Sequence, residues 1–297
     1  MENPKVSVIT PTYKRSGMLP RAIKSVLNQS YQNIEIIVVD DNNPDTEWRI
    51  ATEERMQEFK DDPRVKYVKH EKNMNGSVAR NTGIAASTGD IITYLDDDDW
   101  YYTEKIEKQV KYLLDHPEHH AVYCGWRRYG DELPNAEGDV AASILSGQDV
   151  IITNSIMMWK KDTVECGGWD NTLRRHQEAA LLLNYCRIGG AFGRLPEILV
   201  EFDISDRGNT INTKTNEKII DYLLEKYDDL VELQEKKKKG SKAYIYCGRY
   251  KALVYSNILN RKYVEACRVY CKILRLYPFY FNVFLFKDIL KRITKKK

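Results

Sequence analysis

Four consecutive aspartates, Asp96 to Asp99, are the most chemically suggestive residues of the 297-residue sequence. They directly follow the apolar run 91–95. Neighbouring carboxylates repel one another unless a cation lies among them. Mg²⁺ typically takes one or two carboxylates and completes its shell with substrate phosphates and water. We therefore expect a bound Mn²⁺ or Mg²⁺ here, with a solvated acidic loop as the alternative.

Two further polar residues, Tyr13 and Asp41, also stand where apolar runs end. Short β-branched runs alternate with helical periodicity, which predicts a β-α-β-α-β order and a mostly parallel sheet with helices on both faces. In such sheets ligands bind beyond the carboxyl ends of the strands. The expected strands are 6–9, 34–39, 65–68 and 91–95, and the expected helices are 19–27 and 77–86.

The rest of the chain changes character near residue 212. Before that point we expect strands and one further helix, and beyond it only helices. We expect an α/β domain over 1–212 and a basic helical region over 213–297. The expected strands are 121–129, 156–159 and 198–202, and the expected helices are 178–188, 215–234, 243–259 and 263–276.

Composition and charge exclude several classes of protein. Hydrophobic residues make up 42% and charged residues 30%, which is typical of a folded, soluble chain. No apolar stretch approaches the ~18 residues of a membrane span and no signal peptide is evident, so we expect a cytoplasmic protein. Glycine-rich dinucleotide and P-loop motifs are missing. The net charge of +3 hides an acidic body and a basic end, because residues 236–297 hold 18 Lys and Arg against two acids.

Four ordered motifs together resemble glycosyltransferase family 2, and the resemblance covers about residues 4–205. It implies the GT-A fold, a Rossmann-like α/β architecture, and inverting transfer of a sugar from a nucleoside diphosphate sugar. The motifs are VSVITPTYKR (6–15), IIVVDD (36–41), NMNGSVARNTGI (73–84) and GDIITYLDDDD (89–99).

The family pattern implies how the donor binds. It puts Pro11 and Tyr13 against the nucleobase, with Tyr13 stacking, and makes Asp41 the acceptor of a hydrogen bond from the base. A carboxylate facing an imide N–H favours uracil over cytosine, which suggests a UDP-sugar. Without the motif, the pair Asp40 and Asp41 is interpreted equally well as a helix cap or a turn.

The same pattern places the rest of the donor near the acidic run. Asp96 or Asp97 lies near the ribose, and Asp98 ligates the metal that bridges the two phosphates. Arg80 follows the start of a predicted helix, where backbone N–H groups and a guanidinium suit an anion. An internal salt bridge to one of the acidic strand ends is the alternative for Arg80.

Inverting transfer also needs a general base to deprotonate the acceptor hydroxyl. The segment 167–178 resembles the family's Gly-Gly-aromatic-Asp turn followed by a base, which falls on Glu178. The family more commonly has Asp there, so we also consider a helix N-terminal role for Glu178 and keep Asp170 as the reserve base. Trp169 is an expected core residue or acceptor contact.

A second departure concerns a histidine that many relatives carry after the strand that follows Pro196. This chain has no histidine there, and the candidates to replace its contact with metal or phosphate are Asp203, Asp206 and Arg207.

These observations predict an inverting glycosyltransferase that uses a nucleotide-sugar donor and a glycan or lipid-linked acceptor in cell-surface polysaccharide synthesis. The aromatic, basic segment 279–293 and the terminal lysines favour peripheral contact with the anionic inner face of the cell membrane. Packing of those aromatics on the body is the alternative. An adaptor that binds membrane or nucleic acid through its basic helices, with an inactive α/β domain, is the competing function. We do not expect nucleic acid as a partner.

Overall fold

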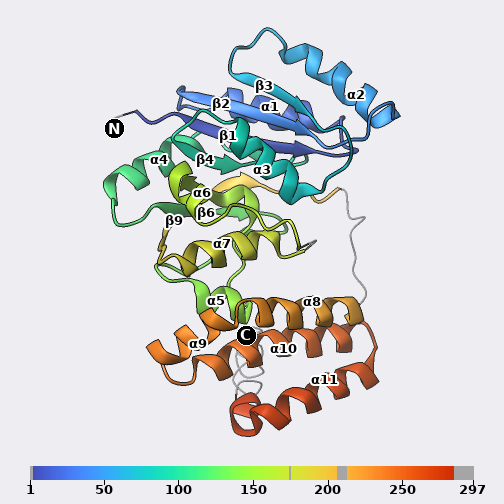
Figure 1. Ribbon diagram of the computed structural model, residues 1–297, viewed down its shortest axis with the longest axis vertical. Coiled ribbons are helices and arrows are strands. Elements are labelled where there is room, and N and C mark those ends of the chain that lie inside the picture. Colours follow the sequence, from blue (N-terminus) through green and yellow to red (C-terminus); the bar gives the residue numbers. More distant parts are fainter. Residues whose placement is uncertain (1–2, 174, 206–212, 284–297) are drawn as a thin grey trace. The chain divides into compact units, whose positions relative to one another are not determined.

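The computed structural model describes residues 3–173, 175–205 and 213–283 of the chain (Figure 1). These residues form two compact units. The first lies within Met1–Val140 and Ile151–Asp206, and the second within Ala141–Val150 and Arg207–Lys297. The segment 141–150 therefore belongs to the helical unit, although the sequence analysis divided the chain only near residue 212.

The first unit is built on one mixed sheet, which has nine strands among the described residues in the order β3-β2-β1-β4-β8-β6-β9-β5, with β7 paired to β6 (Figure 1). Strands β1 to β4 run parallel, whereas β8 is antiparallel to both β4 and β6. The strands are β1 (Val6–Thr12), β2 (Ile34–Asp40), β3 (Val65–Lys69), β4 (Ile91–Tyr94), β5 (Trp100–Tyr101), β6 (Ala121–Arg127), β7 (Asp131–Glu132), β8 (Ile156–Trp159) and β9 (Phe192–Glu201).

Helices cover both faces of this sheet. Strand β2 packs against both layers, because successive side chains of a strand point to opposite faces. On one face Ile36 and Val38 of β2 share a core with α1 (Leu19–Leu27). On the other face Ile37 and Val39 pack with Ala79 of α3 (Gly76–Ala86). The unit's remaining helices are α2 (Glu47–Met56), α4 (Lys105–Asp115), α6 (Lys160–Glu165) and α7 (Gln177–Arg187).

The first strand is longer than the sequence predicted. We expected Pro11 to stop it, yet β1 runs through Pro11 to Thr12 and Pro11 pairs with Val39. The pairing of β1 with β4 ends at Ile9. No β4 residue therefore lies opposite Pro11 to accept a backbone hydrogen bond that proline could not donate. A proline is tolerated in a strand where no ladder hydrogen bond is lost.

The length of the last strand was also underestimated. We expected 198–202, whereas β9 begins at Phe192 and pairs with β6. The register shifts beside Gly125, where Leu195 pairs with Cys124 but Ile198 pairs with Gly125. Pro196 lies in this irregularity, which interrupts the local pattern from which a strand is predicted.

The second unit contains helices in its described part. We expected one helix over 215–234, but two are present, and Tyr227 is fully buried where they meet. None of the described helices is long and apolar enough to cross a membrane. The helices are α5 (Ala141–Ser146), α8 (Thr213–Lys226), α9 (Asp228–Lys237), α10 (Ser241–Leu259) and α11 (Tyr263–Leu276).

Candidate active site

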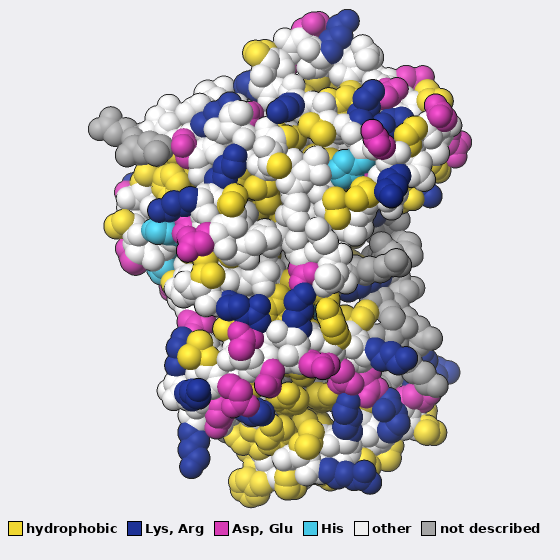
Figure 2. Space-filling model, viewed as in Figure 1, with side chains coloured by type: hydrophobic (Ala, Val, Ile, Leu, Met, Phe, Trp, Pro, Cys, Tyr) yellow, Lys and Arg dark blue, Asp and Glu magenta, His cyan; other side chains and the backbone are white. Residues whose placement is uncertain are grey.

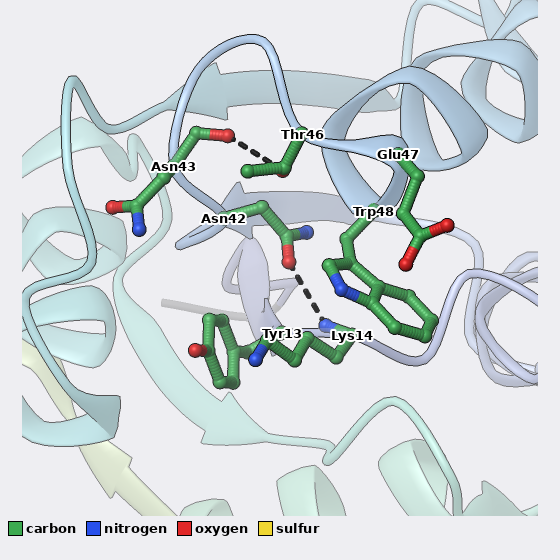
Figure 3. A pocket seen from close by; sticks show the side chains of 7 residues that line it. All are labelled: Tyr13, Lys14, Asn42, Asn43, Thr46, Glu47 and Trp48. Carbon is green, nitrogen blue, oxygen red and sulfur yellow. Dashed lines mark hydrogen bonds between the residues drawn. The ribbon is translucent and has the colours of Figure 1, made fainter.

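Tyr13 and Pro11 lie at the carboxyl end of β1, as predicted from the strand pattern. The Tyr13 ring is 42% exposed and lines a cavity of about 400 Å³. Trp48, from the first turn of α2, is 38% exposed and lines the same cavity (Figure 3). The sequence analysis missed Trp48 because the polar helix α2 shows no apolar periodicity. The other lining residues are Lys14, Asn42, Asn43, Thr46 and Glu47.

Asp41 is buried at the end of β2, and its carboxylate holds the loop that leads into α3. Its Oδ1 atom meets His70 Nδ1 at 2.7 Å and accepts a hydrogen bond from Met74 N at 2.7 Å. Its Oδ2 atom accepts from Asn73 Nδ2 at 2.8 Å and from Asn75 N at 3.0 Å. Four donors thus surround this carboxylate, and they fix the backbone just before the first turn of α3.

The four aspartates after β4 differ in their surroundings. Asp96 is paired with Arg80, with 2.6 Å between Oδ1 and Nη2. Asp97 is buried and accepts a 2.7 Å hydrogen bond from Thr12 Oγ1. Asp98 is less enclosed, with a side chain 14% exposed. Asp99 is fully buried and accepts hydrogen bonds from the Asp203 backbone N–H and from the amide of Asn154.

The surroundings of these carboxylates disfavour their ionised forms. Burial raises the pKa of Asp97 to about 7, although the hydrogen bond from Thr12 opposes the shift. Burial and repulsion from Asp96 and Asp98 raise the pKa of Asp99 to about 9. Burial and the charge of Asp96 also raise the pKa of Asp98. A cation placed among them would lower the electrostatic energy of the ionised state.

Two arginines that the sequence analysis did not single out reach the aspartates Asp96 to Asp99, which we call the acidic edge of the sheet. Arg15 Nη1 lies 2.8 Å from Asp98 Oδ2. Arg21, on α1, lies over the Trp100 ring and pairs with Asp203 at 2.6 Å. Hydrogen bonds from Ser205, followed by Arg21, lower the pKa of Asp203 to about 2. Asp206 and Arg207, the other candidates for this contact, lie outside the described residues.

Arg80 connects the acidic edge with α7. Besides its ion pair with Asp96, it donates to Gln177 Oε1 at 3.3 Å and lies 4.6 Å above the Trp169 ring. The internal salt bridge considered for Arg80 is therefore present. Gly76 makes room for this arrangement, since a Cβ there would stand 3.0 Å from Arg80 Nη1.

Glu178, the predicted base, lies in the first turn of α7 and is half-buried. Its neighbour Gln177 contacts Arg80, which is paired with Asp96. The first turn of α7 therefore lies near the acidic edge. Trp169 is only 1% exposed and packs edge-on against Tyr94, which makes it a core residue. Asp170 accepts hydrogen bonds from the N–H and hydroxyl of Thr172, as a turn residue does.

The donor set at the edge suits a hard divalent cation only in part. Among the described residues no three His, Cys, Asp or Glu side chains converge on one point. One or two carboxylates are nevertheless what Mg²⁺ or Mn²⁺ requires when phosphate oxygens and water supply the remaining ligands. The residues therefore fit an ion that binds together with a diphosphate.

Comparison with known proteins identifies the family. The family model of Glycosyl transferase family 2 matches residues 7–174, more than half of the chain. An uncharacterised glycosyltransferase of Haemophilus influenzae is 40% identical over 114 residues, which is 38% of this chain and 44% of that protein. The GalNAc(5)-diNAcBac-PP-undecaprenol beta-1,3-glucosyltransferase of Campylobacter jejuni is 41% identical over 99 residues, or 32% of this chain and 30% of the relative. These matches thus span less than half of either relative's length.

The fold extends the likeness over the whole chain. The mannosyltransferase PcManGT of Pyrobaculum calidifontis, solved with GDP-Man and Mn²⁺, superposes with a TM-score of 0.62 at 17% identity, covering 99% of this chain and 88% of that one. The predicted GT-A architecture with C-terminal helices is confirmed. Together with the family match, the sheet and its acidic edge lead to one conclusion: the chain belongs to glycosyltransferase family 2.

Proposed function

We propose that the protein is a metal-dependent, inverting glycosyltransferase that transfers a sugar from a nucleoside diphosphate sugar, preferably a UDP-sugar, to a glycan or lipid-linked acceptor. The observation that carries this proposal is the Arg80 bridge. One guanidinium contacts Asp96 on the acidic edge and Gln177 beside Glu178. Groups suited to the donor phosphates and a carboxylate suited to proton removal thus belong to one connected site.

The nucleobase is proposed to stack on Tyr13 beside Pro11. The exposed Tyr13 ring and the adjoining cavity support this, because a solvent-accessible aromatic ring can stack on a base. Asp41 remains the proposed acceptor of the base N–H. Two of its present donors, His70 and Asn73, are side chains that can rotate away, whereas the N–H groups of Met74 and Asn75 belong to the backbone.

The diphosphate is proposed to bind at the acidic edge together with the metal. Asp98 would hold the ion, and Asp96 or Asp97 would contact the ribose. When bound, Mn²⁺ or Mg²⁺ stabilises the negative charge that develops on the leaving diphosphate. Arg80 adds a buried positive charge at the same edge. The raised pKa values of Asp97, Asp98 and Asp99 support a cation in this position, because it would stabilise their ionised forms.

Glu178 is proposed to act as the general base. The acceptor hydroxyl oxygen attacks the anomeric carbon, the bond from that carbon to the diphosphate oxygen breaks, and the hydroxyl proton passes to the Glu178 carboxylate. Attack from the side opposite the leaving group inverts the anomeric configuration. The position of Glu178 in the first turn of α7, next to the residue that contacts Arg80, supports this role.

A donor panel tests the proposal. The protein is incubated with Mn²⁺ and each of several UDP-sugars and GDP-sugars, and release of the nucleoside diphosphate is measured with and without undecaprenyl-diphosphate-linked acceptors. Thermal shift in the same panel identifies binding without turnover, since a ligand stabilises the folded state by RT ln(1 + [L]/Kd). Release or stabilisation by one UDP-sugar supports the proposal. Its absence with every donor contradicts it.

The acceptor is proposed to be lipid-linked, with the protein at the cytoplasmic face of the membrane. The Campylobacter relative's name includes an undecaprenol-linked substrate, which supports this acceptor class. Exposed apolar side chains stand at the turn between α10 and α11, where Leu259 is 83% and Val264 80% exposed. Arg261 and Lys262 lie between them. Figure 2 shows hydrophobic side chains gathered over the region of α11, bordered by Lys and Arg and also by Asp and Glu. Mixed apolar and basic surfaces suit anionic lipid.

The expected membrane segment 279–293 is only partly described. Phe279 is 83% exposed, whereas Phe281 is fully buried and packs on Tyr270. One of these two aromatics therefore packs within the helical unit, as the alternative had it. Phe284 and the later residues lie outside the described part of the chain.

A further inference from the structure

The carboxylate proposed to bind the metal already has a cationic partner. Arg15 Nη1 lies 2.8 Å from Asp98 Oδ2 and 3.7 Å from Asp97 Oδ1. The guanidinium therefore already occupies one of the two oxygen atoms that Asp98 could offer to a divalent cation. A metal ion and a guanidinium on the same carboxylate repel each other, so the bound guanidinium disfavours binding of the metal.

Arg15 differs from Arg80, the other arginine that pairs with the aspartate run. The Arg80 side chain is 10% exposed and is enclosed by Trp169, Gln177 and Gly76. The Arg15 side chain is 31% exposed and extends from the turn that follows β1. The Arg15 side chain is thus more open to solvent than the Arg80 side chain, which is enclosed by its packing.

The turn that carries Arg15 is itself fixed. Its neighbour Lys14 has a left-handed φ of 62° and donates its N–H to Asn42 Oδ1 at 3.0 Å. This turn also carries Tyr13, the proposed base platform. A nucleotide stacked on Tyr13 with its phosphates at the acidic edge would therefore approach the guanidinium of Arg15.

We infer that Arg15 is an exchangeable counter-ion. It neutralises Asp98 while no donor is bound, gives that carboxylate up to the metal when donor and metal arrive, and then pairs with the diphosphate oxygens. This inference rests on the proposed function. Arg15 is a positioning residue, because it controls when Asp98 becomes available to the ion. Its consequence is that metal alone binds weakly and that metal and nucleotide favour each other's binding.

Removing the guanidinium should change two affinities in opposite directions. In Arg15→Gln, Mn²⁺ alone, measured by the loss of its free-ion electron paramagnetic resonance signal, should bind about tenfold more tightly than in the wild type. UDP alone, titrated by calorimetry in EDTA, should bind more weakly. The enhancement of UDP affinity by Mn²⁺ should remain, since Asp98 is intact, but its size should fall because the competing cation is gone.

Two controls separate exchange from general charge or folding effects. Lys14→Gln removes a neighbouring positive charge that has no contact with the aspartates, and it should change the affinity for Mn²⁺ alone by less than Arg15→Gln does. Arg15→Lys keeps a cation within reach of Asp98 and should bind Mn²⁺ alone nearly as weakly as the wild type. Circular dichroism melts establish that each variant is folded. Should Arg15→Gln fail to fold, Arg15→Met replaces it in the same titrations.

The result that overturns the inference is an affinity for Mn²⁺ alone that is the same, or lower, in the Arg15 variant, including the case in which neither protein binds the ion. A gain no larger than that of Lys14→Gln also overturns it. Tighter Mn²⁺ binding in a protein that turns over no nucleotide sugar would support the counter-ion role and contradict only the proposed reaction.

Discussion

Asn81 on α3 holds the backbone of Trp169 through both ends of its carboxamide. Its Oδ1 atom accepts from Trp169 N at 2.9 Å, and its Nδ2 atom donates to Trp169 O at 2.8 Å. The turn before α7 is thereby fixed to the helix that carries Arg80. Gly168 fits beneath it with φ +64°, and a Cβ there would lie 2.7 Å from Asn81 Oδ1.

Asn81→Ala should therefore destabilise the fold. It leaves the N–H and C=O of Trp169 without their partners, which costs about 1–3 kcal/mol of unfolding free energy. Urea denaturation measures this cost. Asn171→Ala is the matched control, because Asn171 bonds to the same amide nitrogen at 3.1 Å but not to the Trp169 backbone. Equal urea midpoints for the two variants would show that the hydrogen bonds between Asn81 and the Trp169 backbone contribute nothing to stability.

Asp98→Asn should reduce turnover by orders of magnitude, because the amide is a much poorer ligand for a hard cation than the carboxylate. UDP affinity should fall only when Mn²⁺ or Mg²⁺ is present. Titrations with and without EDTA make the comparison. An equal loss of UDP affinity in EDTA would point to a disturbed site instead of a lost metal ligand.

Glu178→Gln keeps the size of the side chain and removes its ability to accept a proton. It should lower kcat by roughly 10²–10⁴-fold with little change in donor affinity. Asp170→Asn is the control, since Asp170 is engaged with Thr172 in the turn. Near-normal kcat in Glu178→Gln combined with a large loss in Asp170→Asn would transfer the base role to Asp170.

Lys105→Met should stabilise the protein at neutral pH. Lys105 is fully buried, with its ammonium nitrogen 2.8 Å from Thr93 Oγ1 and 4.0 Å from the Tyr101 ring centre. Burial lowers its pKa from 10.5 to about 7. The unfolded chain therefore binds the extra proton between these two pH values, so the wild type gains stability as pH rises through that window.

The advantage of Lys105→Met should then be largest near and below pH 7, about 3–5 kcal/mol, and shrink toward pH 10. Urea denaturation of both proteins at pH 7 and pH 9.5 measures the difference. A gap between them that stays constant across this range would contradict a neutral, buried lysine.

Membrane contact is tested by point substitutions in the α10–α11 turn. Replacing Leu259 and Val264 by Ser should weaken co-sedimentation with phosphatidylglycerol vesicles at low salt by removing exposed apolar area. Val164→Ser, at an exposed valine on α6, is the control. Truncation after Pro278 is predicted to abolish binding as well, although it also removes the buried Phe281. Binding unchanged in both variants would exclude this surface.

The sequence alone was enough to predict those strands and helices that leave a pattern in their own residues. The runs that became β2 and β4 are mostly apolar. The first ends at Asp40, and Asp96 follows the second after Leu95, so their identity and their polar carboxyl ends could be predicted. The four motifs then identified the family. Tertiary structure decided what reaches those ends from elsewhere. Arg15 pairs with Asp98, and Asn154 with Asp99, across long separations in the chain, which no local pattern encodes.

The same reason explains the elements that were missed. Pro11 continues β1 only because β4 has already ended beside it, and β9 tolerates Pro196 only because its register against β6 shifts there. Each depends on a neighbouring strand. Helix α2 contributes Trp48 to the cavity without any apolar periodicity of its own. Local sequence determines which segments can form strands and where carboxylates follow them, whereas packing between distant segments decides which charges those carboxylates meet.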